Sequence, residues 1–356
     1  MPSIVNLLLT LPRLGSPFLS QLTYEVLSEL FSSPAEDNDH GMSDQGSNAL
    51  KAVLSSPPSK SDTAIAPAWL NVVGNAMLVY RTTDPEACAA EVEKVWKIVW
   101  PFLESNVSPT RQASASSLSL LCRCFTPLLI SSAIAEAGLA GTTTSLSKII
   151  EQITNGLDSL SLAPSIPEIL AVISSLIYNL RYRASRTSPS AAETLLLPLI
   201  QKVGDQRTKK GFEFKDSADK VLATAMLVVG PEVLFRVLPL NLEPSDRYDI
   251  ISLLQNSLGS FLRHRSEAGR EPRAFLLPLL SNPHPSPLGH FVSYFVPMSE
   301  RMFDLQQKAE SDGRQSEAKV WSVLVAQIWA GLAGYCFAAI DLKEVGMPGP
   351  RPIIMG

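Results

Sequence analysis

Charged residues are scarce in this sequence: Asp, Glu, Lys and Arg make up 18% of its 356 residues, against about 25% in an average globular protein. The net charge is −4, which excludes a chain that coats nucleic acid along its whole length by positive charge. Local basic clusters are not excluded. Because hydrophobic residues make up 46%, a large apolar surface must be buried when the chain folds.

Cysteine is also scarce, and no Cys-x-x-Cys pair occurs. His284 and His290 flank a proline-rich turn without a thiol or carboxylate near them in the sequence, so no metal site and no cofactor are expected. Scattered cysteines in a chain of this length are interpreted as buried, reduced thiols, which favours the cytosol or the nucleus. These cysteines are Cys88, Cys122, Cys124 and Cys336.

Catalytic motifs are missing as well. The sequence contains no Gly-x-Ser-x-Gly, no His-Glu-x-x-His, no P-loop and no Gly-x-Gly-x-x-Gly. No catalytic residue is therefore assigned, and the protein is not expected to be an enzyme. One uncharged stretch, Val320–Ile340, is long enough to span a bilayer. Its apolar residues recur every four positions, so a buried helix explains it equally well.

Amphipathic helices are what the sequence does contain. In Ser165–Leu180 the apolar residues recur at steps of three and four, which is the pattern of one helix face. Ser165 and Glu168 have the spacing of a capping box, in which each side chain accepts a hydrogen bond from the backbone amide of the other residue. Arg181 and Arg183 follow, where positive charge offsets the helix dipole. The sequence therefore predicts a helix over 165–180.

The same combination of cap, proline and apolar stripe recurs along the chain. Asp84-Pro85-Glu86 predicts one helix start, and Glu243-Pro244-Ser245-Asp246 predicts another. No segment alternates apolar and polar residues with a period of two, so no sheet is expected. Further helices are predicted over Ser108–Phe125, Thr144–Leu157, Ala191–Val203, Asp216–Val229, Ser286–Ala309 and Ser316–Ala333.

Short turns rich in proline, serine and glycine join these helices, which is typical of helix pairs that bury their apolar stripes by stacking on neighbours. No strict sequence period is present. This favours an all-α superhelix (solenoid) of the HEAT or armadillo-like class, predicted over residues 1–343. A compact helical domain is the alternative. A polar stretch at residues 33–66 predicts a mobile loop with one short helical turn near Ala49–Leu54, and residues 344–356 predict a disordered tail.

Basic clusters are the candidate binding residues. They fall at helix ends and turns, so on one rim of a solenoid they would contact RNA phosphates. The alternative is that they only solubilise helix ends. No aromatic residues are interleaved with them, so base stacking is not expected. The candidates are Arg181, Arg183, Arg186, Arg207, Lys209, Lys210, Arg263, Arg265, Arg270 and Arg273.

Four stretches combine such helices with distinctive turns. These are Ile4–Ser32, Val221–Leu242 with its Gly-Pro-Glu turn, Arg273–Ala309, and Glu317–Cys336 with its Gln-Ile-Trp. In their order and spacing they resemble the ribosomal RNA-processing protein 12 family of helical-repeat proteins. The resemblance covers most of the chain and identifies Val320–Ile340 as a solenoid helix rather than a membrane span.

The resemblance implies a nuclear and nucleolar scaffold of ribosome biogenesis. Its expected tasks are ribosomal RNA processing, assembly of small-subunit precursors and nuclear export of subunits. The implied partners are pre-ribosomal particle proteins, ribosomal RNA precursors, the Ran GTPase and transport receptors, and a nuclear transport adaptor is the alternative function. Family members are longer on both sides, so we expect a fragment or a truncated gene model. The resemblance carries no residue-level site to this chain.

Overall fold

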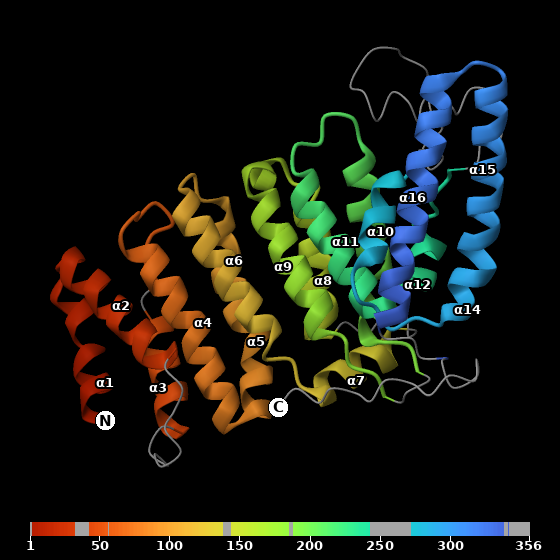
Figure 1. Ribbon diagram of the computed structural model, residues 1–356. Coiled ribbons are helices and arrows are strands. Elements are labelled where there is room, and N and C mark those ends of the chain that lie inside the picture. The colour runs from red at the N-terminus through yellow and green to blue at the C-terminus, as the bar shows by residue number, and fades with distance from the viewer. Residues whose placement is uncertain are drawn as a thin grey trace. The chain divides into compact units, whose positions relative to one another are not determined.

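A computed structural model describes residues 2–32, 43–55, 57–137, 144–184, 188–242, 272–337 and 341. Across these ranges every regular element is a helix (Figure 1). The predicted all-α fold is therefore confirmed. The predicted single array over 1–343 divides into two units, 1–196 and 197–356, whose boundary falls inside one long helix.

Unit 1 contains most of the helices. They are α1 (Pro2–Leu8), η1 (Leu11–Leu14), α2 (Pro17–Ser32), α3 (Ser43–Leu54), α4 (Ile65–Thr83), α5 (Pro85–Val99), η2 (Trp100–Glu104), α6 (Ser108–Cys122), α7 (Pro127–Glu136), α8 (Ser145–Gly156), η3 (Leu160–Ser165) and α9 (Ile166–Asn179). Helix α10 (Ala191–Thr208) crosses the boundary.

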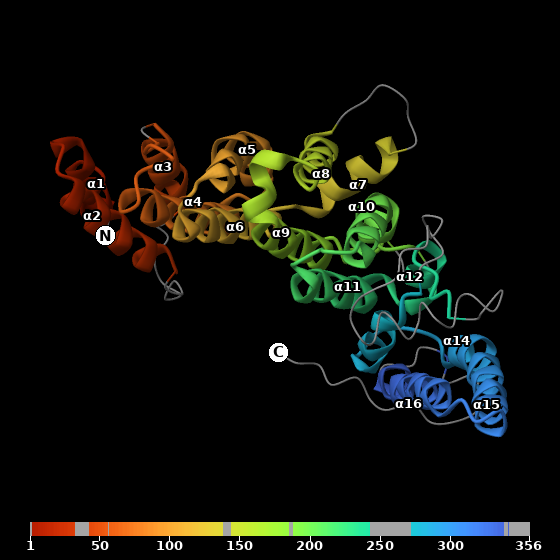
Figure 2. The same cartoon turned by 90° about the horizontal axis from the view of Figure 1, so that it is seen from above.

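Unit 1 is built as two rows of stacked helices. In one row α2 packs on α4, α4 on α6 and α6 on α9, and in the other α3, α5 and α8 cover them (Figure 2). The core between the rows includes the fully buried Trp69, Trp96 and Leu118. The helices in the middle of this stack, such as α4, thus bury their apolar residues against neighbours on both sides, as expected for a helical-repeat stack.

Local sequence signals set most of the helix starts. Asp84 Oδ1 accepts a hydrogen bond from Ala87 N at 3.0 Å, with Pro85 in the first turn, so this predicted start is confirmed. Thr144 Oγ1 caps α8 in the same way, accepting from Ser147 N at 3.1 Å. These caps satisfy amide donors that have no partner within the helix.

The capping box predicted at Ser165 is wrong. Ser165 makes no side-chain cap. Its buried hydroxyl donates to Leu103 O instead. Glu168 faces Arg111 of α6, with Oε1 3.5 Å from Nε. Both groups were drawn away from the cap by partners about sixty residues distant, which local spacing does not reveal.

The predicted polar loop over 33–66 is also corrected, because α3 lies within it and α4 begins at Ile65. Ala49, Leu50 and Val53 of α3 are buried, and Val53 O accepts a hydrogen bond from Trp69 Nε1 at 3.0 Å. Three apolar residues at helical spacing suffice to dock a polar helix on α4. Residues 33–42 and 56 lie outside the described residues.

Unit 2 also consists of helices. Beyond α10 they are α11 (Lys215–Val229), α12 (Pro231–Val237), the 3-10 helix η4 (Ala274–Ser281), α14 (Leu288–His290), the π-helix η5 (Phe291–Phe295), α15 (Val296–Ser311) and α16 (Gln315–Phe337). The helix predicted from Glu243 and the tail predicted over 344–356 lie outside the described residues.

Helix α16 packs on α15 and on η4. Close approach to η4 needs two glycines: a Cβ on Gly331 would lie 2.7 Å from Leu280 Cβ, and one on Gly334 would lie 2.5 Å from Asn282 O. By length and composition alone, Gln315–Phe337 and Leu160–Asn179 could cross a membrane. Within its unit, each has helical neighbours against which some of its apolar residues are packed.

Candidate functional site: interaction surfaces

The basic residues around the end of α10 form the first candidate surface. Arg207 is half-buried and forms two hydrogen bonds with the Asp219 carboxylate, from Nε to Oδ1 at 2.7 Å and from Nη2 to Oδ2 at 3.1 Å. Its guanidinium also lies 4.3 Å from the centre of the Phe275 ring. The guanidinium group of Arg207 is thus held by Asp219 and Phe275. These contacts join α10, α11 and η4.

Arg273 is a structural residue rather than a surface contact. Its side chain is only 4% exposed, and it donates from Nη1 to Pro239 O at 3.0 Å and from Nη2 to Asp205 Oδ1 at 2.9 Å. A guanidinium buried in this way is not available to a phosphate group. The position of Arg273 in a basic turn predicted a phosphate contact. Its partner Asp205 is 68 residues away, so no local pattern indicates the ion pair.

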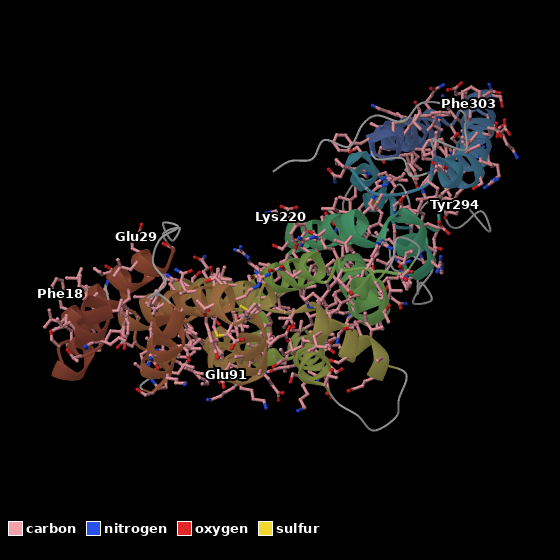
Figure 3. All side chains as sticks on the ribbon, turned by 90° about the horizontal axis from the view of Figure 1, so that it is seen from below. Phe18, Glu29, Glu91, Lys220, Tyr294 and Phe303 are labelled. Carbon is pink, nitrogen blue, oxygen red and sulfur yellow. The ribbon has the colours of Figure 1, made fainter. Side chains whose placement is uncertain are left out.

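The exposed charge in this region belongs to lysines. Lys209 and Lys210 follow Arg207, and Lys215 and Lys220 lie on α11, all four exposed (Figure 3 labels Lys220). Exposed acidic residues, Glu213 and Asp216, lie among them. The structure therefore brings four lysines to the α10–α11 turn, and we call Lys209, Lys210, Lys215 and Lys220 the lysine turn.

Two further candidate arginines lie in unit 1, after α9. Arg181 is exposed, donates from Nη1 to Tyr178 O at 2.9 Å, and lies 4.3 Å from the centre of the Tyr178 ring. Arg183, also exposed, donates to Ser188 O at 2.9 Å. The contact between Arg181 and the half-exposed Tyr178 was not predicted from the sequence. The spacing of three residues between them is the local signal that could have indicated it. Arg186, Arg263, Arg265 and Arg270 lie outside the described residues.

The two histidines of the proline-rich turn belong to an aromatic cluster. His290 Nδ1 lies 2.6 Å from Tyr335 Oη, and the His284 ring packs edge-on against Tyr335 with centroids 4.5 Å apart. Burial lowers the pKa of His284 to about 4 and also lowers the pKa of His290. Among the described residues no group of three or more metal-ligating side chains is assembled.

Three of the four cysteines are buried as predicted, whereas the prediction is wrong for the fourth, Cys336. Cys88 and Cys124 both donate to Met77 O, at 3.3 and 3.8 Å. A hydrogen bond with Cys124, together with burial, raises the pKa of Cys88, and burial raises that of Cys122. Cys336 is exposed, because it falls on the side of α16 that faces away from η4 and α15.

Two hollows lie on the described surface of unit 1. One, of about 220 Å³, lies beside Tyr24 and Pro57 in unit 1. Another, of about 400 Å³, is an open groove along α8 lined by Lys148, Glu151 and Asn155. Neither has the enclosed, mostly apolar lining usual for small-molecule sites.

Exposed apolar residues occur on α16. Val323, Trp329 and Phe337 lie on its outer side and are between 47% and 71% exposed. They are separated by six and eight residues, so they spread over an arc of about 120° of the helix surface rather than one row. Exposed aromatic side chains such as Trp329 and Phe337 are typical of surfaces that bind other proteins.

Comparison with known proteins gives one family and several relatives. A family model described as "Ribosomal RNA-processing protein 12, HEAT repeats" matches residues 104–345. A Schizosaccharomyces pombe protein whose name includes "ribosomal RNA-processing protein 12" is 27% identical over 81% of this chain and 21% of its own length. Ribosomal RNA-processing protein 12 of Saccharomyces cerevisiae is 23% identical over 96% of this chain and 26% of its own.

Vertebrate relatives match to a similar extent. The RRP12-like protein of Homo sapiens is 21% identical over 82% of this chain and 20% of its own length. The chain thus spans between a fifth and about a quarter of the length of these relatives.

Proposed function

Because the chain belongs to the ribosomal RNA-processing protein 12 family, by the match over residues 104–345, we propose that it is a non-enzymatic HEAT-repeat scaffold in ribosome biogenesis. The family match is the observation that carries this proposal, and the names of the yeast relatives support it. Stacked helices offer broad faces rather than an enclosed pocket, which suits a protein that works by binding.

In more detail, we propose that the chain acts in the nucleus and nucleolus, within precursor particles of the small ribosomal subunit. There it supports ribosomal RNA processing and the export of subunits. Its contacts with ribosomal RNA precursors run through phosphate groups, and the lysine turn of unit 2 and the exposed Arg181 and Arg183 of unit 1 supply the positive charge. Arg207 and Arg273 are not included, because their guanidinium groups are held by carboxylates.

The test is affinity purification of the tagged chain from growing cells, followed by quantification of precursor and mature ribosomal RNA. We expect precursor RNA to be enriched over mature RNA. The double variant Lys209→Glu/Lys210→Glu should lower the recovery. The matched control, Lys308→Glu/Lys319→Glu, makes the same charge change at exposed positions of α15 and α16 and should retain it. A folded wild-type chain that enriches no precursor RNA would overturn the proposal.

A transport adaptor is the second candidate function, and the exposed Val323, Trp329 and Phe337 of α16 favour it because exposed aromatic side chains are enriched at protein interfaces. Its expected partners are the Ran GTPase or transport receptors. Binding of the chain to Ran loaded with a non-hydrolysable GTP analogue, but not with GDP, would support it. Phosphate contacts weaken steeply as the salt concentration rises. Binding that persists at high salt would therefore indicate apolar contacts rather than phosphate contacts.

A further inference from the structure

The row of unit 1 in which α6 packs on α9 contains parallel helices (Figure 1). Near the helix starts, Arg111 of α6 faces Glu168 of α9. Further along both helices, Ser175 Oγ of α9 donates to Ser119 O of α6 at 3.0 Å. Both sequence positions rise together from the first contact to the second, so α6 and α9 run in the same direction.

Helix α4 runs in this direction too. A Cβ on Gly74 of α4 would lie 3.1 Å from Ser117 Cα of α6. Further along, Cys124 Sγ, just after α6, donates to Met77 O at 3.8 Å. The C-terminal ends of α4, α6 and α9 therefore lie at one edge of unit 1.

Exposed arginines occupy this edge. Arg81 lies one turn beyond Met77 at the end of α4. Arg123 lies one turn beyond Ser119 at the end of α6, and Arg181 follows α9. All three are exposed. Within the part of the chain that the structure describes, Arg81 and Arg123 form no ion pair.

An exposed aromatic ring lies among these arginines. Tyr178 is 47% exposed and lies one turn beyond Ser175, as Arg123 lies one turn beyond Ser119, so the two are neighbours across the α6–α9 contact. The Arg181 guanidinium lies over the Tyr178 ring, 4.3 Å from its centre, and is held there by the hydrogen bond from Nη1 to Tyr178 O. We call Arg81, Arg123, Tyr178 and Arg181 the arginine edge.

The charge of the edge alone does not identify a ligand. Arginines at helix C-termini offset the helix dipole, but that role requires no exposed aromatic ring. Two exposed carboxylates follow α4, and both already accept hydrogen bonds: Asp84 Oδ1 from Ala87 N at 3.0 Å, and Glu86 Oε2 from Thr126 Oγ1 at 3.1 Å. The ring with its guanidinium group is therefore the feature that indicates what binds.

Nucleic-acid bases stack on aromatic rings and on guanidinium planes. The faces of a base are accessible in a single strand, whereas in a duplex they are covered by the neighbouring base pairs. From the Tyr178–Arg181 pair, Arg123 and Arg81 continue the positive charge at steps of one helix, about 8–10 Å. This arrangement suits the phosphate groups of a strand that leaves the stacking site.

From these observations we infer that the arginine edge binds single-stranded RNA. One base stacks on the Tyr178–Arg181 pair, and Arg123 and Arg81 contact backbone phosphates. The inference rests on the proposed function for the choice of RNA, and it adds to that function a site in unit 1 that selects unpaired segments over duplexes.

The test uses a fluorescein-labelled oligouridine of about ten nucleotides, a length within the range that one single-strand site covers, and a duplex of the same length. Binding to the full chain is measured by fluorescence anisotropy in the Lys209→Glu/Lys210→Glu background, which removes half of the lysine turn. We expect the single strand to bind at least about tenfold more tightly than the duplex. Tyr178→Ala should weaken single-strand binding by at least about fivefold, because one stacked base is lost.

Salt dependence separates stacking from charge. Arg123→Gln should reduce the slope of log affinity against log salt by about 0.7, the value for one phosphate contact with a single strand. Tyr178→Ala should leave this slope unchanged. The controls are Lys94→Gln on α5, with the same charge change at an exposed position, and Leu160→Ala at an exposed side chain of η3. Neither should change binding, and all variants must keep the melting temperature of the parent chain.

Three outcomes would overturn the inference. They are equal RNA affinity of Tyr178→Ala and its parent, equal affinity of the parent for single strand and duplex, and an oligoglutamate peptide that binds more tightly than the oligouridine. The last would identify an acidic protein segment as the occupant. None of them bears on the proposed function, which fails instead if the wild-type chain recovers no precursor RNA from cells.

Discussion

Arg273 Nη2 donates a hydrogen bond to Asp205 Oδ1 at 2.9 Å and so joins residues that are 68 positions apart in the sequence. The contact ties the start of η4 to α10. The backbone hydrogen bond from Arg273 N to Leu240 O at 2.8 Å holds the same junction. Arg273, which was predicted as a phosphate contact from its basic turn, is therefore one of the residues that hold unit 2 together.

Arg273→Ala should lower the free energy of unfolding by about 2 kcal/mol, because Pro239 O and Asp205 lose a buried partner. The loss stays below that of a fully buried ion pair, since the Asp205 side chain is 48% exposed and regains water. Urea denaturation followed by circular dichroism measures it, with Lys209→Ala as the exposed control. Equal stability of the two variants would show that the pair contributes nothing.

Stability should depend on pH through His284. Burial lowers its pKa to about 4 in the folded protein, while an unfolded chain has a histidine pKa of about 6.5. The unfolded state therefore binds more protons below pH 6.5, and the contribution of the neutral ring is lost as the pH falls towards 4. The full effect is on the order of 3 kcal/mol.

The measurement is urea denaturation at several pH values between 7 and 4.5. The charged and titratable groups around the ring are His290, Tyr335 and the more distant Glu232. A hydrogen bond from Lys97 lowers the pKa of Glu93 to about 2, below this pH range. His284→Gln should flatten the slope between pH 6.5 and 5. An unchanged slope in this variant would assign the effect to another group.

Gly334→Ala should destabilise unit 2, although alanine favours a helix by about 1 kcal/mol over glycine. The added Cβ would lie 2.5 Å from Asn282 O and closer still to Leu280 O. Both are backbone atoms, so α16 must move away from η4, with a loss of about 1–3 kcal/mol. Gly289→Ala is the control, because its Cβ would meet Asp341 Oδ2 only at 3.5 Å. Thermal melting of both variants should separate them.

Cys336 should be the fast-reacting thiol among the four cysteines. It is exposed, whereas Cys88, Cys122 and Cys124 are buried, and burial contributes to the raised pKa of Cys88 and Cys122. Reaction with a thiol-specific disulfide reagent should be rapid for one group per chain and slow for the rest until urea is added. Cys336→Ser should remove the rapid phase. A rapid phase that persists in this variant would contradict the burial of the other three.

The sequence predicted features whose causes are local. The Asp84 cap, the proline in the first turn of α5 and the apolar stripe of α9 lie within a few residues of one another, and these helices form close to the predicted bounds. Of helix α3 only a short turn near Ala49–Leu54 was predicted, because polar residues outnumber the apolar ones that dock it. Its docking depends on Trp69, which lies outside the segment.

Functional residues were harder to predict, because exposure depends on distant partners. Arg207 and Arg273 are held by Asp219 and Asp205, and no local pattern distinguishes them from the exposed Lys209. The exposure of Phe18 and Leu22 on α2 was hidden for a related reason. Apolar residues on both sides of a helix predict burial, and only the packing reveals which side is covered.

Co-sedimentation of the tagged chain with small-subunit precursor particles on a sucrose gradient tests the proposed scaffold role. We expect the folded chain to travel with these particles at moderate salt. Raising the salt should release it, and Lys209→Glu/Lys210→Glu should release it at lower salt than the wild type, since each lost phosphate contact weakens binding. A folded chain that stays at the top of the gradient at every salt concentration would contradict the account.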